Sequence, residues 1–179
     1  GAFTEEEINE IISIGDMLEF QNATLGRDTD TDISIRNSKV SWIRPSEKTA
    51  WLFNKVVEII SRINRDKFQF DLTYIREFQY TTYSEGGFYV WHIDNDQKEK
   101  YGSEFRKLGV SILLSDPTED FVGGEFQIMP QGNPEDINTT KLKKGDVIVF
   151  PSFIPHRVTT VTSGKRKSLV CWVLGPKFK

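Results

Sequence analysis

Cysteine is almost absent from this chain of 179 residues, which contains only Cys171. A single cysteine excludes an internal disulfide framework, and it also excludes a metal site built from several thiolates. Cys171 lies in the apolar segment SLVCWV, which predicts a small packed residue of a strand rather than a reactive thiol. The chain is long enough to form a core without disulfides or a structural metal, so a metal would serve chemistry rather than folding.

Long apolar runs are missing as well. No segment approaches the ~18 apolar residues of a membrane span, and the start, GAFTEEEINEI, lacks the basic and apolar regions of a secretion signal. The net charge of -3 and the pI near 5.5 give no general attraction to nucleic acid or to anionic membranes. We therefore expect a soluble, cytoplasmic protein without nucleic-acid or membrane partners, and we expect a monomer.

Two helices are predicted in the first third of the chain. Thr4 and Glu7 form a capping-box pattern before isoleucines at helical spacing, so residues 5–19 are predicted to be a helix. A second helix is predicted over 47–65, with Ser46 as its N-cap and an apolar stripe that would pack against a flat surface.

From residue 68 onward the apolar pattern changes to a period of two, which is typical of strands. The strand-like segments are separated by turns such as SEGG, DPTEDFVGG and QGNPED. They read FQFDLTYIREFQYTTY, GFYVWHID, LGVSILLS, GEFQIMP, GDVIVFP, HRVTTVT and KSLVCWVL. About eight strands after two helices indicate the α+β class, with the helices bracing one sheet of a jelly roll.

No repeat or linker-like stretch indicates a domain boundary. We predict one domain over 1–179, with helical support in 1–67 and the jelly-roll core in 68–176. In the first part, DISIRNSKVSWI is expected to form a hairpin that turns at Asn37. The polar stretch NDQKEKYGSEFRK, residues 95–107, follows the strand GFYVWHID and is predicted to be a lid.

One of the two histidines, His92, stands two residues before Asp94 in the strand-like segment YVWHID. On a strand, side chains at i and i+2 project from the same face. A buried, unpaired carboxylate is costly, so this pair requires water, a partner or a metal. Taken alone, the pair favours the simplest of these, a buried hydrogen bond between the histidine and the aspartate.

The other histidine, His156, begins a later predicted strand, and the chain between it and Asp94 has room for about four strands. Two histidines and one carboxylate suit Fe(II), with open positions left for other ligands. Ten residues later, Arg166 has no acidic residue near it in sequence, so inside a barrel it would require a ligand carboxylate. Strand parity then turns Ser168 and Trp172 inward with Arg166. Taken singly, His156 could be a turn histidine and Arg166 a surface charge.

In combination, these residues resemble the Fe(II)- and 2-oxoglutarate-dependent oxygenases of the prolyl 4-hydroxylase-like group. The matching elements, in this order, are Tyr83-Ser-Glu-Gly86, Tyr89, His92-x-Asp94, His156 and a basic residue ten positions later. ILLSDPTEDFVGGEF and GDVIVFPSFIPHRVTTVTSGKRKSLVCWV are also similar to the bacterial hydroxylase subgroup. The likeness covers about residues 73–174 and implies a double-stranded β-helix, which is a jelly roll.

The resemblance implies a role for each matching position. His92, Asp94 and His156 would hold the iron. Arg166 would bind the distal carboxylate of 2-oxoglutarate, with the Tyr83 hydroxyl as a second donor. The implied cofactors and co-substrates are Fe(II), 2-oxoglutarate and O2, and ascorbate stays open.

The implied reaction is hydroxylation of a C–H bond with release of succinate and CO2. A prolyl residue of a peptide or protein is the first substrate that the resemblance suggests, while a free amino acid or another small molecule stays open. Tyr89 and Trp172 would line the substrate pocket, although aromatic strand residues often belong simply to the core. The rival of another class is an inactive jelly-roll module that keeps a metal as structure. A nucleic-acid demethylase is disfavoured, because such relatives carry a second arginine where this chain has Trp172.

Overall fold

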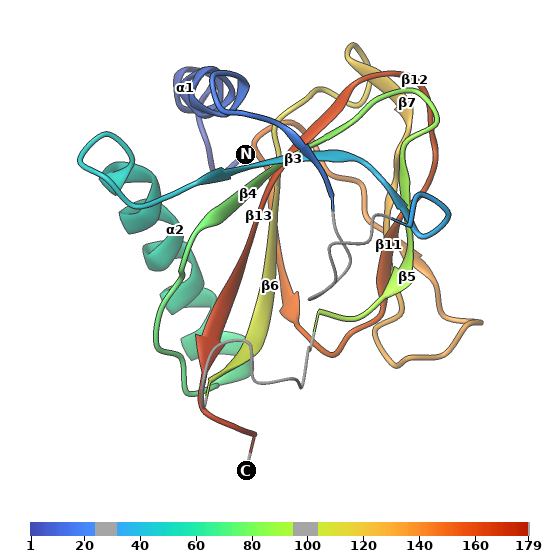
Figure 1. The fold of residues 1–179 in the computed structure, drawn as a ribbon. Coiled ribbons are helices and arrows are strands. Elements are labelled where there is room, and N and C mark those ends of the chain that lie inside the picture. The colour runs from blue at the N-terminus through green and yellow to red at the C-terminus, as the bar shows by residue number, and fades with distance from the viewer. Residues whose placement is uncertain (24–31, 95–103, 179) are drawn as a thin grey trace.

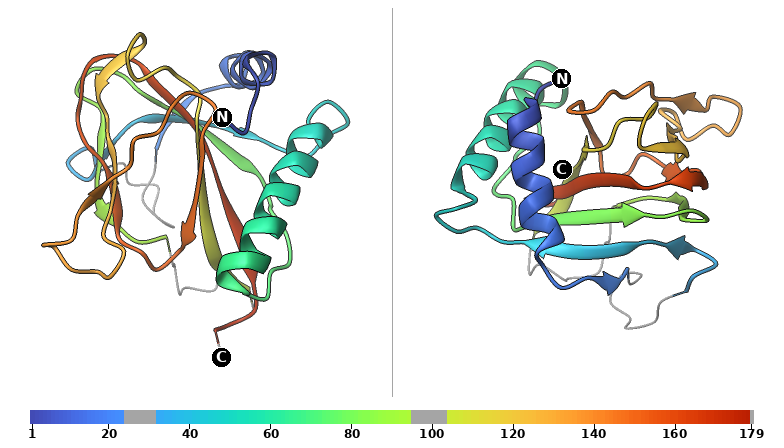
Figure 2. Two further views of the ribbon diagram at one scale, coloured as in Figure 1. Left: turned by 180° about the vertical axis from the view of Figure 1, so that it is seen from behind. Right: turned by 90° about the horizontal axis from the view of Figure 1, so that it is seen from above.

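Two β-sheets face each other, and two helices lie against the larger sheet (Figure 1). The computed structural model describes residues 1–23, 32–94 and 104–178. Its helices are α1 (Glu5–Asp16) and α2 (Ala50–Ile63), which is followed by a π-helical turn, η1 (Asn64–Phe68). Both helices lie on one side of the sheets in Figure 2. No helix of the described part is long and apolar enough to cross a membrane.

The larger sheet has six antiparallel strands in the described part of the chain. Their order across the sheet is β1 (Gln21–Asn22), β3 (Lys39–Ile43), β4 (Phe78–Tyr83), β13 (Arg166–Gly175), β6 (Phe105–Leu113) and β10 (Val147–Pro151). The longest ladders join β13 to β4 and to β6, so β13 is a central strand of this sheet.

The smaller sheet has five strands within the described ranges. Their order is β2 (Arg36–Asn37), β5 (Phe88–His92), β11 (His156–Val158), β8 (Phe126–Ile128) and β9 (Asn138–Thr139). A two-stranded ribbon of β7 (Phe121–Gly123) and β12 (Val161–Gly164) stands beside the sheets. β5 and β11 are neighbours, which brings together segments more than sixty residues apart in sequence.

The chain moves back and forth between the two sheets from β4 to β13, except that β8 and β9 follow each other as a pair in the smaller sheet. The quartet β4, β13, β6 and β10 lies in the larger sheet, and the quartet β5, β11, β8 and β9 lies in the smaller one. This alternation of eight antiparallel strands is the double-stranded β-helix, so the predicted α+β jelly roll is confirmed. Both sheets also take strands from residues 1–67, the segment predicted to be helical support, because β1 and β3 join the larger sheet and β2 joins the smaller.

Two apolar clusters hold this arrangement together. The first lies between the helices and the larger sheet and includes Ile11, Leu52 and Phe78, all with no exposed surface. The second lies between the sheets and includes Phe126 and Phe150. Hydrophobic burial on both faces therefore fixes the larger sheet between the helices and the smaller sheet.

Strand β13 has the predicted side-chain parity. Leu169 and Cys171 belong to the cluster that faces the helices, and Cys171 is a free, buried thiol as predicted. Burial raises the pKa of this thiol, which keeps it protonated and unreactive. Arg166 and Trp172 lie on the opposite face, toward the smaller sheet, where Arg166 donates a hydrogen bond to Ser168.

Both predicted helices are present, but their first or last residues differ from the prediction. The capping box of α1 is present, since Thr4 and Glu7 exchange side-chain to backbone hydrogen bonds of 2.8 and 3.3 Å. The helix ends at Asp16, three residues earlier than predicted. In α2 the N-cap is Thr49 rather than Ser46, because the Ser46 N–H donates to the Thr49 hydroxyl within a turn that precedes the helix.

Three strand-level predictions were wrong. The segment DISIRNSKVSWI forms no hairpin: β2 pairs with β5 and β3 with β4, so the chain crosses between the sheets at Ser38. Residues 69–77 lie outside the ladders apart from one bridge, between Ile75 and Val173. The stretch 95–107, predicted to be a lid, overlaps a strand at its end, since Phe105 begins β6. Residues 95–103 of that lid lie outside the described part of the chain.

Candidate metal centre

The pairing of β5 with β11 places the two histidines side by side. His92 is the last residue of β5, His156 is the first of β11, and the two are direct cross-strand partners. Their ring centroids are 4.1 Å apart. Asp94 follows two residues after β5, and its backbone N–H donates to the Ser152 carbonyl at 2.8 Å, which fixes the chain where it leaves the strand.

The three side chains converge on one point. The Asp94 carboxylate lies 3.8 Å from Nε2 of His92 and 3.6 Å from Nε2 of His156. All three potential ligand atoms lie within 4.8 Å of one another, and Asp94 and His156 are buried. Distances above 3.5 Å are too long for direct hydrogen bonds, so the simpler interpretation of a His–Asp hydrogen bond does not describe this geometry. A cation between the three atoms fits it.

Backbone carbonyls set the tautomer of both histidines. Nδ1 of His92 lies 2.8 Å from the Val90 carbonyl, and Nδ1 of His156 lies 3.0 Å from the Ile154 carbonyl. A carbonyl can only accept, so both Nδ1 atoms must carry the proton. In its neutral form, each ring therefore presents an unprotonated Nε2 to the centre, which is the arrangement of a metal-binding histidine.

The electrostatics of His92 favour the neutral ring. Burial, and then the neighbouring His156, lower the pKa of His92 to about 3, against the smaller opposing effect of Asp94. The ring is thus uncharged at neutral pH. No proton has to be displaced from it before a metal binds.

Gly109 on β6 leaves the space that Asp94 occupies. A Cβ atom at this position would lie 2.9 Å from Oδ2 of Asp94 and 2.7 Å from the Phe150 ring. Any larger residue would push the carboxylate away from the two histidines. Phe150 also packs against His156, with ring centroids 4.6 Å apart, so the centre has an apolar wall.

A bulge in β5 turns Tyr89 to the same side as His92. His156 and Val158 on β11 are two residues apart, but their partners on β5, His92 and Tyr89, are three apart. The extra residue reverses the side-chain parity between these two partners. The Tyr89 ring consequently stacks on the His92 ring, with centroids 3.5 Å apart and planes 14° apart. Burial raises the pKa of Tyr89 to about 12.

Arg166 lies on the larger sheet, as the first residue of β13 and the direct cross-strand partner of Tyr83. It is 2% exposed, and its guanidinium carbon is 5.7 Å from the centroid of the Tyr83 ring. Its Nη1 donates to the Ser168 hydroxyl at 3.2 Å, and its Nε has no partner in the described ranges. No carboxylate of the described residues forms an ion pair with it. A buried guanidinium with these neutral neighbours is suited to an anionic ligand.

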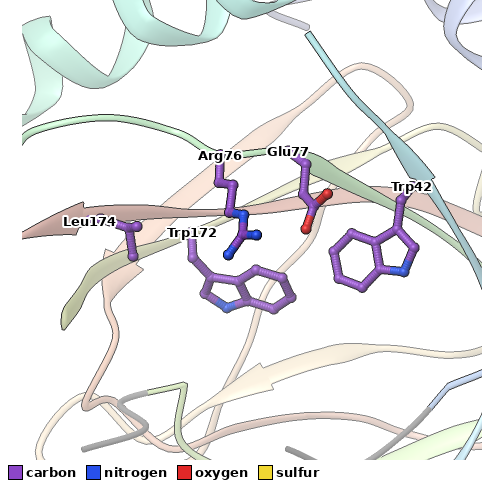
Figure 3. A pocket seen from close by; sticks show the side chains of 5 residues that line it. All are labelled: Trp42, Arg76, Glu77, Trp172 and Leu174. Carbon is purple, nitrogen blue, oxygen red and sulfur yellow. The ribbon is translucent and has the colours of Figure 1, made fainter. Parts of the chain in front are cut away.

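Trp172 lies further along β13, in a pocket that it shares with Trp42, Arg76, Glu77 and Leu174 (Figure 3). In Figure 3 the Arg76 and Glu77 side chains reach toward the two indoles. Nε1 of Trp172 is buried and has no hydrogen-bond partner among the residues described. The indole is therefore available as a donor, which a purely structural tryptophan rarely leaves unpaired.

The structure thus brings the predicted site residues together in three groups. His92, Asp94 and His156 form the centre with Tyr89 stacked on it, Arg166 pairs with Tyr83, and Trp172 lies in the pocket with Trp42. Two further residues, Gly109 and Arg36, were missed from the sequence. Arg36 was not singled out, since its segment DISIRNSKVSWI was expected to form a hairpin.

Comparison with known proteins gives a family. The model of the 2OG-Fe(II) oxygenase superfamily matches residues 78–174, which is more than half of the chain. A PKHD-type hydroxylase of Psychrobacter sp. is 35% identical over 100 residues, which cover 52% of this chain and 36% of that protein. The chain therefore spans well under half the length of this curated relative.

Solved structures agree with the fold. A Pseudomonas putida prolyl-4-hydroxylase superposes with a TM-score of 0.75 at 19% identity, covering 96% of this chain and 88% of that one. A Trichoplax adhaerens prolyl hydroxylase, solved with a peptide of hypoxia inducible factor, gives a TM-score of 0.75 at 21% identity, with 94% and 76% covered. The matched segment contains both histidines, Asp94 and Arg166, and the chain belongs to the 2OG-Fe(II) oxygenase superfamily.

Proposed function

We propose that this protein is an Fe(II)- and 2-oxoglutarate-dependent dioxygenase that hydroxylates a C–H bond, releasing succinate and CO2. The observation that carries the proposal is the convergence of two Nε2 atoms and one carboxylate within 4.8 Å, with both Nδ1 atoms held by carbonyls. A structural site would close its coordination with a fourth protein ligand, whereas two histidines and one carboxylate leave positions open.

In this proposal His92, Asp94 and His156 hold the iron. The donor set of two neutral imidazoles and one carboxylate fits Fe(II), and the space that Gly109 leaves keeps Asp94 in reach. When bound, Fe(II) with 2-oxoglutarate and O2 supplies the oxidising chemistry. The protein contributes the fixed tautomers, the single negative charge of Asp94 and an apolar wall against water.

Arg166 binds the distal carboxylate of 2-oxoglutarate, and Tyr83 assists it. The support is the burial of Arg166, its unpaired Nε and the neutral groups around it. A guanidinium prefers a carboxylate because two parallel hydrogen bonds form at once. Tyr83 is 3% exposed beside the guanidinium, so it restricts where that carboxylate can lie.

Tyr89 and Trp172 form walls of the substrate pocket. Tyr89 covers His92, and Trp172 offers an unpaired indole N–H. A prolyl residue of a peptide or protein is the proposed substrate, because two structural neighbours are named as prolyl hydroxylases and one was solved with a peptide. A free amino acid is the alternative.

The test is turnover by the iron-loaded protein. The protein is incubated with 2-oxoglutarate, O2 and a panel of proline-containing peptides and free amino acids, and succinate and a 16 Da mass gain of each candidate are measured. We expect slow succinate formation without a substrate and acceleration by the true one. If iron-loaded protein forms no succinate under any condition, the dioxygenase proposal is wrong and the inert metal-binding module is favoured.

A further inference from the structure

A second buried arginine lies beside the metal centre. Arg36, on β2, is only 8% exposed. Its guanidinium carbon is 4.6 Å from the centroid of the Tyr89 ring, and the same ring stacks on His92 at 3.5 Å. Because the histidine covers one face of the ring, the guanidinium lies over the other face. Arg36 is thus separated from a metal-centre histidine by a single aromatic ring.

The neighbours of Arg36 are uncharged. Its Nε donates to the Ser38 hydroxyl at 2.9 Å, and its Nη2 donates to the Gln79 side-chain oxygen at 2.8 Å. Nη1 makes no hydrogen bond with the described residues, and no described carboxylate forms an ion pair with this arginine. A guanidinium has five donors, so most of its hydrogen-bonding capacity remains for a ligand.

Arg36 also lies next to the open pocket of Figure 3. Gln79, which accepts from Arg36, is the direct cross-strand partner of Trp42, and Trp42 lines that pocket with Trp172. Arg36 therefore contacts both the cross-strand partner of Trp42 and the aromatic ring that stacks on His92.

The buried charged side chains around the metal centre do not balance one another. The buried charged side chains of the described part are Arg36, Asp94, Arg166 and Lys107, and Lys107 lies elsewhere, against the Phe178 ring. The two arginines and Asp94 leave one excess positive charge among these buried groups. Fe(II) and the two carboxylates of 2-oxoglutarate cancel each other, so this excess persists when both are bound. A buried charge without a counter-charge is unfavourable, and one more anionic group would remove the excess.

We propose that Arg36 binds a carboxylate of the substrate that is hydroxylated. This assignment rests on the proposed function, because it takes the second carboxylate of 2-oxoglutarate to be bound by Arg166. The carboxylate has two possible sources: the α-carboxylate of a free amino acid or a peptide C-terminus, and an acidic side chain next to the target residue. Both present the planar pair of oxygens that a guanidinium recognises.

The test compares acids with their amides. Protein loaded with Zn(II) and 2-oxoglutarate, which cannot turn over, is titrated calorimetrically with each amino acid and its amide. Two peptide pairs extend the series. The first compares a peptide that ends in proline with its C-terminal amide. The second compares two end-capped peptides that differ only in having Asp or Asn after the proline. Tighter binding of the acid in the amino-acid pairs or in the first peptide pair would show recognition of an α-carboxylate. Tighter binding of the Pro-Asp peptide would show recognition of an acidic side chain.

We expect at least one acid to bind about tenfold more tightly than its amide, as a charge-assisted hydrogen bond predicts. Arg36→Gln should abolish this preference and Arg36→Lys should retain part of it. Arg157→Gln is the matched control, because Arg157 also donates to a glutamine oxygen at 2.8 Å and lies 4.8 Å from an aromatic centroid, that of Trp91. By strand parity it faces away from His156, so the preference should survive in this variant.

Equal binding of acid and amide in every pair overturns the proposal, and so does the absence of binding by all acids. An acid preference that persists in Arg36→Gln also overturns it. The dioxygenase proposal fails separately, through a lack of succinate formation by iron-loaded wild-type protein under every condition, with or without a candidate substrate. Because the titration uses an inert metal, an acid preference can be found even if that oxidation is never observed.

Discussion

Asp94 is the one carboxylate of the candidate metal centre among the described residues, and it lies between two histidines. We predict that Asp94→Ala abolishes iron binding and succinate formation, because the remaining imidazoles supply no charge to balance the cation. Metal-free stability should change little, since the variant keeps the backbone hydrogen bond to Ser152 and removes a buried charge. Calorimetric iron titration and urea unfolding of metal-free protein measure the two effects.

The control for this variant is Asp66→Ala, which removes an exposed carboxylate paired with Arg65. It should leave iron binding and turnover at wild-type levels. Strong loss of stability in metal-free Asp94→Ala would contradict the assignment and support a carboxylate that serves packing.

His92 makes the stability of the metal-free protein depend on pH. Its pKa is about 3 in the folded protein, mainly through burial, and about 6.5 in an unfolded chain. Between these values the unfolded state binds a proton that the folded state does not, so acid favours unfolding. We predict that the free energy of unfolding is not reduced by His92 above about pH 6.5. It should fall progressively as the pH drops from about 6.5 toward about 3.

Urea midpoints measured with a chelator present check this profile. His92→Asn is the comparison, because its amide can still donate to the Val90 carbonyl but does not titrate in this range. The difference between wild type and variant should depend on pH. A difference that is constant from pH 7 to 4 would show that burial does not keep His92 neutral.

At the residue scale, sequence reasoning found the groups that have no partner nearby in the chain. Arg166 was identified because no acidic residue lies near it in sequence, and the structure shows a guanidinium among neutral groups. Arg36 did not satisfy this criterion, because Asp32 lies four residues before it, and its segment was expected to form a hairpin. Gly109 could not be found at all, because its function is to leave space for a residue distant in sequence.

At the scale of elements, α2 braces the sheet that carries Arg166. Leu52 on this helix has no exposed surface and belongs to the cluster that faces β4, β6 and β13. We predict that Leu52→Ala lowers the free energy of unfolding by about 3 kcal/mol, because it leaves a cavity in a packed core. Denaturant unfolding measures the loss.

Val57→Ala is the control on the same helix, since Val57 is 48% exposed. Its effect should stay within about 0.5 kcal/mol, as is usual for surface positions. Equal losses in the two variants would indicate that helix propensity, and not packing on the sheet, determines the contribution of α2.

The bulge in β5 shows why element boundaries alone did not define the site. Strict alternation puts residues three apart on opposite faces of a strand, so it separates Tyr89 from His92. The structure stacks them, because one extra residue is accommodated between two cross-strand pairs. A bulge depends on the partner strand, which lies more than sixty residues away and is invisible to a local pattern.

At the scale of the whole molecule, the site joins the two sheets. The metal-centre histidines come from the smaller sheet and Arg166 from the larger. We predict that Zn(II) raises the melting temperature of the wild-type protein and that 2-oxoglutarate raises it further only when Zn(II) is present, because ligands stabilise the state that binds them. Differential scanning fluorimetry with each ligand alone and with both measures this order.

The variant Arg166→Gln separates the increase in melting temperature caused by Zn(II) from the increase caused by 2-oxoglutarate. It should keep the shift caused by Zn(II) and lose most of the additional shift caused by 2-oxoglutarate, since the variant cannot pair with a carboxylate. An undiminished second shift would show that the distal carboxylate binds elsewhere in the pocket.

The overall architecture was predictable, but its connections were only partly so. Alternating apolar segments from residue 68 onward indicated the jelly roll, because strand periodicity is a local property. The crossing at Ser38, which sends β2 and β3 to different sheets, was not predictable, since tertiary pairing decides between a hairpin and a crossover. Thr49 likewise replaced Ser46 as N-cap because two hydroxyl residues compete for one turn.

The division of the site between two sheets has a consequence for the length of the co-substrate. Facing sheets are separated by about 10 Å, a spacing set by the side chains packed between them. With the metal-binding histidines on one sheet and Arg166 on the other, this spacing sets the distance between the two ends of the site. We therefore expect a dicarboxylate one carbon shorter than 2-oxoglutarate to bind more weakly, because it would span the two sheets less well. If Arg166 binds the distal carboxylate as proposed, the thickness of the core would select the co-substrate by size.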